Sequence, residues 1–197
     1  MRREVGDEAR ATAEALAAHF GLEPLPREGG RFRRLWAGPE RGDGRPEGSA
    51  IVMLLTDTPG DYCALHRLPD DEVWHYYLGA PLQLLLLPPE GRAPVSTPVL
   101  GPDVLDAGHQ VQLTVPAGTW MGARVGTAGA DAGDGPDGPD GPDGPDGSDG
   151  TDGTGAWTLF GCTMAPGYTD AGYEHGDADA LARAYPEHAR LIRELAR

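Results

Sequence analysis

The sequence predicts an all-β domain, folded as an antiparallel sandwich or barrel with helices at both ends. Short runs of strand-forming residues recur about every 8 to 12 residues, and Gly and Pro separate them. This spacing favours an antiparallel architecture over βαβ units. At 197 residues the chain is long enough for one domain with a sizeable core.

The first predicted element is an alanine-rich helix near the N-terminus. Asp7 is a suitable N-cap, the helix runs to His19, and Gly21 suits the C′ position after it. Leu16 and Phe20 are four residues apart, so they share one face of this helix.

Eight predicted strands follow. The first alternates Phe32, Arg34 and Trp36 with their neighbours, which is the period of two that a strand requires. The glycine- and charge-rich stretch 38–48 after it is predicted to be a loop. The predicted strands are 31–36, 50–56, 62–68, 72–78, 82–87, 110–115, 120–125 and 157–164.

Two helices are predicted at the C-terminus. The first begins after Asp177 and ends at about Ala184. The second runs from Pro186 to Ala196, because proline suits the first position of a helix. Ile192 and two leucines form its apolar face.

The acidic charge of the chain is concentrated in one segment. The formal net charge is −15, and eight aspartates lie within residues 126–155, together with eleven glycines and no large apolar residue. Such a segment cannot contribute to a core, so we expect a disordered hairpin insertion there. Glycine at every third position resembles collagen. A collagen triple helix would, however, bring one aspartate from each of its three chains together at every triplet, and the repulsion between these charges argues against it.

The charge and composition exclude several functions. A net charge of −15 without a basic stripe argues against nucleic acid and anionic membranes as partners. All 16 basic residues are arginine, which excludes a Schiff-base or P-loop lysine. No apolar run has the length of a signal peptide or membrane span, and Cys63 and Cys162 are expected to be buried thiols. The predicted location is therefore the cytoplasm.

Two motifs resemble those of the cupin superfamily. The first spaces Gly60, His66, Glu72 and Gly79 by five, five and six residues, and the second is the Pro-x-Gly turn of residues 116–121. The resemblance implies a double-stranded β-helix, the cupin or jelly-roll barrel. It therefore implies a single cupin domain over residues 1–197, with an N-terminal helix and C-terminal helices.

The same resemblance implies a metal site, but only two of its four usual ligands are present. His66 and Glu72 remain, whereas Leu68 and Met121 occupy the positions of two histidines. The methionine thioether is a soft ligand and suits Zn, Fe or Mn poorly. We therefore expect no cofactor, and a divalent metal, if bound, would take His66 and Glu72.

Further segments resemble the fifth cupin group, a family of small cytoplasmic cupins without an established general activity. This family is similar in fold to the deoxysugar-nucleotide epimerases and forms dimers by strand exchange, so the resemblance also implies a homodimer. The segments are 26–33, 49–55, 66–77, 84–87, 115–120, 161–168 and 185–189.

Strand alternation predicts which residues line a pocket inside the barrel. His66 and Glu72 would face the interior, where burial raises the pKa of Glu72 unless a cation pairs with it. These two residues are the candidate acid/base couple, and Tyr168 is a third catalytic candidate. The candidate ligand-binding residues are Arg33, Ser49, Trp74, Tyr76, Gln83, Trp120, Met121 and Cys162.

We expect a cupin that binds a small polar or anionic molecule in this pocket, with proton transfer by His66 and Glu72 as any chemistry. One alternative is a sugar-nucleotide epimerase or isomerase, with His66 as base and Tyr168 as acid. Others are a metal-dependent oxygenase and a non-catalytic sensing or binding module. The sequence leaves open which of these applies, and whether the protein is an enzyme.

Overall fold

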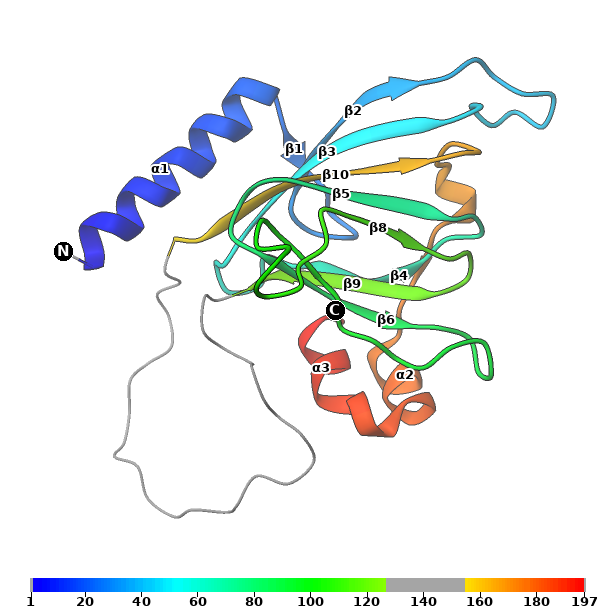
Figure 1. Cartoon of the computed structure of the whole chain (residues 1–197). Helices are drawn as coiled ribbons and strands as arrows, with labels where there is room; N and C mark the ends of the chain where they lie inside the picture. The colour runs from blue at the N-terminus through cyan, green and yellow to red at the C-terminus, as the bar shows by residue number, and fades with distance from the viewer. Residues whose placement is uncertain (1, 127–154, 197) are drawn as a thin grey trace, which may run out of the picture.

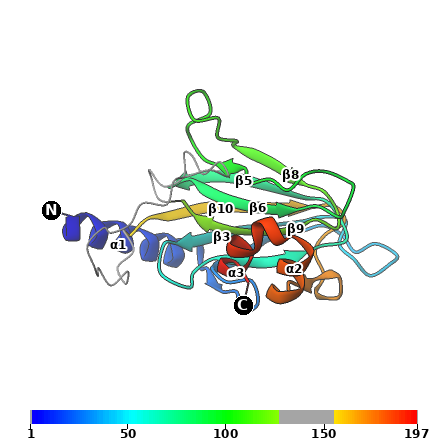
Figure 2. The same cartoon turned by 90° about the horizontal axis from the view of Figure 1, so that it is seen from below.

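The computed structural model describes residues 2–126 and 155–196, and the side chains from residue 6 onward. The predicted insertion, apart from its two end residues, lies outside the described residues. Two antiparallel sheets face each other and enclose the core, with α1 (Arg2–Phe20) against the outside of one sheet and the C-terminal helices against the other (Figures 1 and 2). The prediction of an all-β barrel with terminal helices is confirmed.

Each sheet combines strands that are distant in sequence, and all pairs of strands in both sheets are antiparallel. The six-stranded sheet has the order β1 (Glu23–Pro24), β2 (Arg31–Ala37), β3 (Ser49–Thr56), β10 (Trp157–Met164), β5 (Glu72–Gly79) and β8 (Gln112–Val115). The five-stranded sheet has the order β11 (Glu174–His175), β4 (Cys63–Arg67), β9 (Trp120–Val125), β6 (Leu82–Leu87) and β7 (Val99–Leu100).

The leucine run of β6 is explained by its two covered faces. Leu82 and Leu84 belong to the core between the sheets, whereas Leu85 and Leu87 pack against the C-terminal helices on the other side. A strand buried on both faces needs apolar residues throughout, rather than in alternation. On the opposite side of the molecule, Ala17 and other small residues of α1 pack against the outer face of β3 and β10.

The helices differ from the predicted ones at their ends. The α1 helix begins at Arg2, so Asp7 lies inside it and not at its N-cap, because the residues before Asp7 include good helix formers. The predicted helix from Pro186 is divided into a 3-10 turn, Pro186–His188, and α3, Ala189–Glu194. No helix in the described ranges combines the length and hydrophobicity needed to cross a membrane.

Asp177 caps α2 (Ala178–Ala184), as predicted, by accepting a hydrogen bond of 2.7 Å from the Ala180 amide. We expect Asp177→Ala to lower the free energy of unfolding by about 1 kcal/mol. Asp179→Ala is a matched control, since Asp179 is also acidic and in the first turn but accepts no cap bond. Urea unfolding followed by circular dichroism measures both. Equal losses would show that charge at the helix end, and not the cap, stabilises α2.

Candidate functional site

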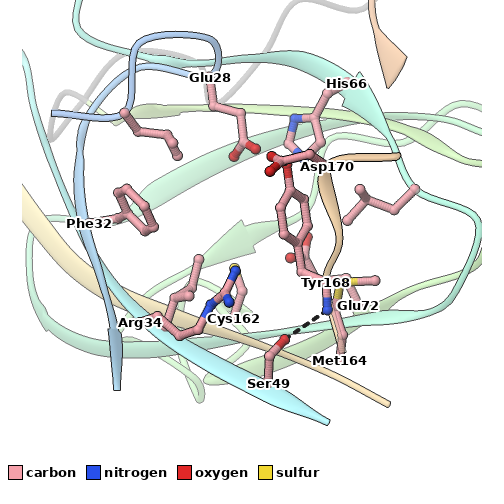
Figure 3. Close-up of a pocket in the computed structure, with 13 residues that line it drawn as sticks. Glu28, Phe32, Arg34, Ser49, His66, Glu72, Cys162, Met164, Tyr168 and Asp170 are labelled. Carbon is pink, nitrogen blue, oxygen red and sulfur yellow. Dashed lines mark hydrogen bonds between the residues drawn. The ribbon is translucent and has the colours of Figure 1, made fainter. Parts of the chain in front are cut away.

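A cavity of about 210 Å³ lies between the sheets, and strands of both sheets line it (Figure 3). Its apolar wall consists of Leu25, Phe32, Ile51, Leu68 and Met164. Its polar groups come from Glu28, Arg34, Ser49, His66, Glu72, Cys162, Tyr168 and Asp170. An apolar cavity with a few convergent polar groups is the usual form of a small-molecule site.

Glu72 is a buried carboxyl group in the wall of this cavity. The Trp74 indole N–H donates a hydrogen bond of 2.8 Å to Glu72 Oε2, and the Trp74 ring stacks on Phe160 with centroids 5.3 Å apart. Burial raises the pKa of Glu72 to about 7, and the nearby Glu28 carboxylate adds to this effect. The charge of His66 and the hydrogen bonds from Trp74 and Cys162 act in the opposite direction.

His66 is the second buried titratable group of the cavity. Its Nδ1 lies 2.9 Å from the Ala64 carbonyl oxygen. Since a carbonyl can only accept, we assign the ring proton to Nδ1, which leaves Nε2 with a free lone pair. The Tyr173 ring stacks on His66 at 5.4 Å, and the Arg27 guanidinium lies 4.4 Å from the centre of the Tyr173 ring.

The segment that follows β10 contributes Tyr168 and Asp170 to the cavity. The Tyr168 amide donates to Ser49 Oγ at 3.0 Å (Figure 3). The Tyr168 hydroxyl donates to Asp170 Oδ1 at 3.2 Å. Burial raises the pKa of Tyr168 well above its usual range, and the negative charges of Glu28 and Asp170 raise it further. Tyr168 therefore holds its proton firmly at neutral pH.

The structure brings five of the predicted site residues to this cavity: Ser49, His66, Glu72, Cys162 and Tyr168. It places the other six elsewhere. Trp74 lies behind the cavity wall, and the Tyr76 hydroxyl donates to the Gly79 carbonyl at 2.6 Å. Met121 is a core residue paired with His66 in the β4–β9 register, and it is not among the lining residues.

Arg33, Gln83 and Trp120 point away from the cavity. Arg33 is one position out of phase with the lining residues of β2, and its guanidinium donates to the Phe20 carbonyl at 3.0 Å. Gln83 alternates with inward-facing leucines and accepts from Arg124 at 3.0 and 3.1 Å. Trp120 packs with the cluster under the C-terminal helices. For these residues the expected inward placement is wrong, because adjacent strand residues face opposite sides.

Sequence reasoning missed three charged residues of the cavity, namely Glu28, Arg34 and Asp170. Arg34 follows from the alternation of β2 once Phe32 is known to point inward. Glu28 and Asp170 lie in irregular segments, where no periodicity indicates the direction of a side chain. With Glu72 they give the cavity three carboxyl groups and a single guanidinium.

The four-ligand metal site implied by the motifs does not fit the residues present. Leu68 offers no ligand atom, Met121 is a core residue, and Oε2 of Glu72 already accepts the Trp74 hydrogen bond. A different group brings metal-ligating atoms together. One atom each of Glu28, Cys63 and His66 lie within 4.8 Å of one another.

Comparisons with known proteins agree with this architecture. The family model described as "Cupin superfamily (DUF985)" matches residues 14–176. A crystal structure of a Shewanella oneidensis protein has a TM-score of 0.72 and 26% identity, covering 93% of this chain and 96% of that one. A hypothetical protein from Leishmania major has a TM-score of 0.71 and 26% identity, covering 93% and 97%. No curated protein matches the chain.

Proposed function

The chain belongs to the DUF985 family of the cupin superfamily, and we propose that its barrel cavity binds a small molecule and transfers a proton to or from it. The observation that carries this proposal is the Glu72 carboxyl group, which is buried in the cavity wall and has a pKa of about 7. At neutral pH a group with this pKa is present in both its protonated and its ionised form. It can therefore act as a general acid or as a general base.

His66 completes the couple. When the ring is neutral, its Nε2 is the second proton acceptor of the cavity, because the Nδ1–H group donates to the Ala64 carbonyl. A ligand seated between the two residues can give a proton to one and receive a proton from the other. Trp74 acts as a positioning residue, since its indole N–H fixes the orientation of the Glu72 carboxyl group.

The charge and size of the cavity narrow the class of ligand. Three carboxyl groups against the single guanidinium of Arg34 favour a neutral or cationic molecule, rather than the anionic one that remained open from the sequence. The volume of about 210 Å³ is below the roughly 300–1,000 Å³ of sites that enclose drug-sized ligands. We therefore propose a small polar metabolite as the ligand.

The epimerase alternative receives less support. It requires Tyr168 to donate a proton, but the raised pKa of Tyr168 makes it a weak acid. A sugar nucleotide would also bring a diphosphate to a cavity that is rich in carboxyl groups. The homodimer stays a prediction. Leu35 and Trp36, exposed on β2, are apolar side chains that a second copy could cover.

A thermal-shift panel of sugars, amino acids, amines, nucleotides and phosphate esters tests the proposal. A ligand at a hundredfold excess over its Kd stabilises the native state by about 2.7 kcal/mol, or roughly 5–10 °C for a chain of this size. We expect a neutral or cationic compound to produce such a shift, and Glu72→Gln and His66→Ala to reduce it by more than half. Glu90→Gln, which removes an exposed carboxyl group outside the cavity, is the control.

Three results would count against the proposal. Equal ligand-induced shifts in the wild type and both cavity variants would show that the ligand binds elsewhere. Shifts confined to nucleotides and phosphate esters would contradict the assigned charge preference. A panel with no stabilising member would argue against ligands of all these classes.

A further inference from the structure

Cys63 and His66 share one side of β4 because of an irregularity in the strand. Residues three apart in a regular strand point to opposite faces. Here Cys63 pairs with Ala123 of β9 and His66 pairs with Met121, so three steps along β4 match two along β9. One extra residue on one strand of a pair defines a β-bulge, and a bulge changes the direction in which the side chains point. As a result, Cys63 Sγ lies 4.0 Å from His66 Nδ1.

Glu28 reaches the same place from a tight turn before β2. The Ala64 amide donates to the Glu28 carbonyl oxygen at 2.6 Å, which holds the turn against β4 between Cys63 and His66. In Figure 3 the Glu28 carboxylate lies beside the His66 ring at one end of the cavity. Within the described part of the chain, that carboxylate takes part in no hydrogen bond or ion pair.

The geometry and the charge of this group suit a divalent ion. The three ligand atoms lie within 4.8 Å of one another. In a tetrahedral site with the usual metal–sulfur and metal–nitrogen bond lengths, the sulfur and the nitrogen are about 3.5 Å apart. Small side-chain rotations would therefore bring the three ligand atoms to metal-binding distances. A carboxylate and a thiolate together carry two negative charges, which balance a divalent cation.

We propose that Glu28, Cys63 and His66 form a binding site for one divalent transition-metal ion of borderline softness, the class of Zn²⁺ and Co²⁺. Thiolate, imidazole and carboxylate together favour such an ion over the hard Mg²⁺ and Ca²⁺. The Ala64 carbonyl, which accepts from the His66 ring, is a typical partner for orienting a metal-binding imidazole. Binding releases the Cys63 thiol proton to solvent.

The site has three protein ligands, and its fourth position faces the cavity, since Glu28 and His66 both line it. Three ligands and an open position are the arrangement of metal sites that also bind a small molecule or water. It differs from the site that the cupin motifs imply, because it shares only His66 with that set. It also differs from the expectation that a metal would take His66 and Glu72.

The test is a titration of chelator-treated, reduced protein with Co²⁺, followed by absorption spectroscopy. We expect one equivalent to bind and to produce a thiolate-to-cobalt charge-transfer band with tetrahedral visible bands. Cys63→Ala should abolish the charge-transfer band and weaken binding at least tenfold. Glu28→Gln should weaken binding about tenfold or more and keep the band. The matched control is Cys162→Ala, which removes the other buried cysteine and should change neither.

Circular dichroism melting without metal establishes that each variant is folded, and Glu28→Gln, at a half-buried turn residue, keeps the test informative if Cys63→Ala does not fold. Three results would overturn the proposal. They are no stoichiometric Co²⁺ binding by the wild type, an unchanged band in Cys63→Ala, and loss of the band in Cys162→Ala. The readout is the cobalt spectrum, so a negative result leaves the proposed proton transfer untouched. Because Nδ1 carries the ring proton, the ion takes the Nε2 lone pair of His66, so His66 accepts a proton only in the metal-free protein, and Glu72 is the proton-transfer group when the ion is bound.

Discussion

Replacing Glu72 by glutamine is expected to raise the free energy of unfolding by about 3 kcal/mol at pH 8 and to leave it nearly unchanged at pH 4. The pKa of Glu72 is about 7 in the folded protein, against an ordinary value of 4.5. Each unit of difference corresponds to about 1.4 kcal/mol between the two states, so the folded protein is destabilised by about 3 kcal/mol once Glu72 is ionised.

The sign of this change in the free energy of unfolding follows from which state, folded or unfolded, binds the Glu72 proton more tightly. Below pH 4.5 the carboxyl group is protonated in both states and contributes no difference. Between pH 4.5 and 7 the unfolded chain loses the proton first, so the stability contributed by the protonated group is lost as pH rises. Above pH 7 the loss is complete. Glutamine does not titrate, and its carbonyl oxygen can still accept the Trp74 hydrogen bond.

Urea unfolding of the wild type and Glu72→Gln between pH 4 and pH 8.5 measures this difference directly. The control is again Glu90→Gln, whose exposed carboxyl group should give no comparable pH-dependent gain. A difference between wild type and Glu72→Gln that is constant over the whole range would show that packing, and not ionisation, separates them.

A carboxyl group that destabilises its own fold at neutral pH supports the functional proposal. A neutral side chain at the same position would leave the protein more stable. Such costs are typical of sites where activity, rather than stability, requires a residue type. The observation concerns Glu72 specifically, because Glu28 and Asp170, the other carboxyl groups of the cavity, are less buried.

The parts of the fold that the sequence predicts best are its long apolar strands. The bounds of β6, β9 and β10 agree with the predicted ones, because a Pro or Gly turn or the polar insertion borders these apolar runs. The short strands β1, β7 and β11 were missed. Two residues carry no periodicity, so only tertiary pairing creates these strands.

The site was predictable where strands are regular and unpredictable where they are not. Spacing identified His66 and Glu72, and alternation placed Cys162 with them. Cys63 would lie on the face opposite His66 in a regular strand, and the bulge against β9 brings both residues to one side. A single inserted residue changes the face of every residue after it. Sequence periodicity cannot detect this change, because it arises from pairing with another strand.

Phe160→Ala is expected to lower the free energy of unfolding by about 3–5 kcal/mol, the largest loss we predict for a single substitution. Phe160 is fully buried between the sheets and stacks on Trp74 at 5.3 Å. Its removal leaves a void that strands on both sides cannot close, since β3 and β5 are both paired to β10. Chemical denaturation at pH 4, where Glu72 is largely protonated in both the folded and the unfolded state, isolates this packing effect.

Phe160 also supports the site, because its ring stacks on Trp74, the residue that orients Glu72. Trp74 holds the Glu72 carboxyl group through its indole N–H, and this hydrogen bond lowers the pKa of Glu72. Phe160→Leu, which keeps most of the volume but loses the stack, should cost about 1–2 kcal/mol. Phe20→Ala, at a half-buried position on α1, should cost less than half of the Phe160→Ala loss. Equal losses in Phe20→Ala and Phe160→Ala would contradict the role of Phe160 as the packed support beneath Trp74, because that role requires the loss to depend on burial between the sheets.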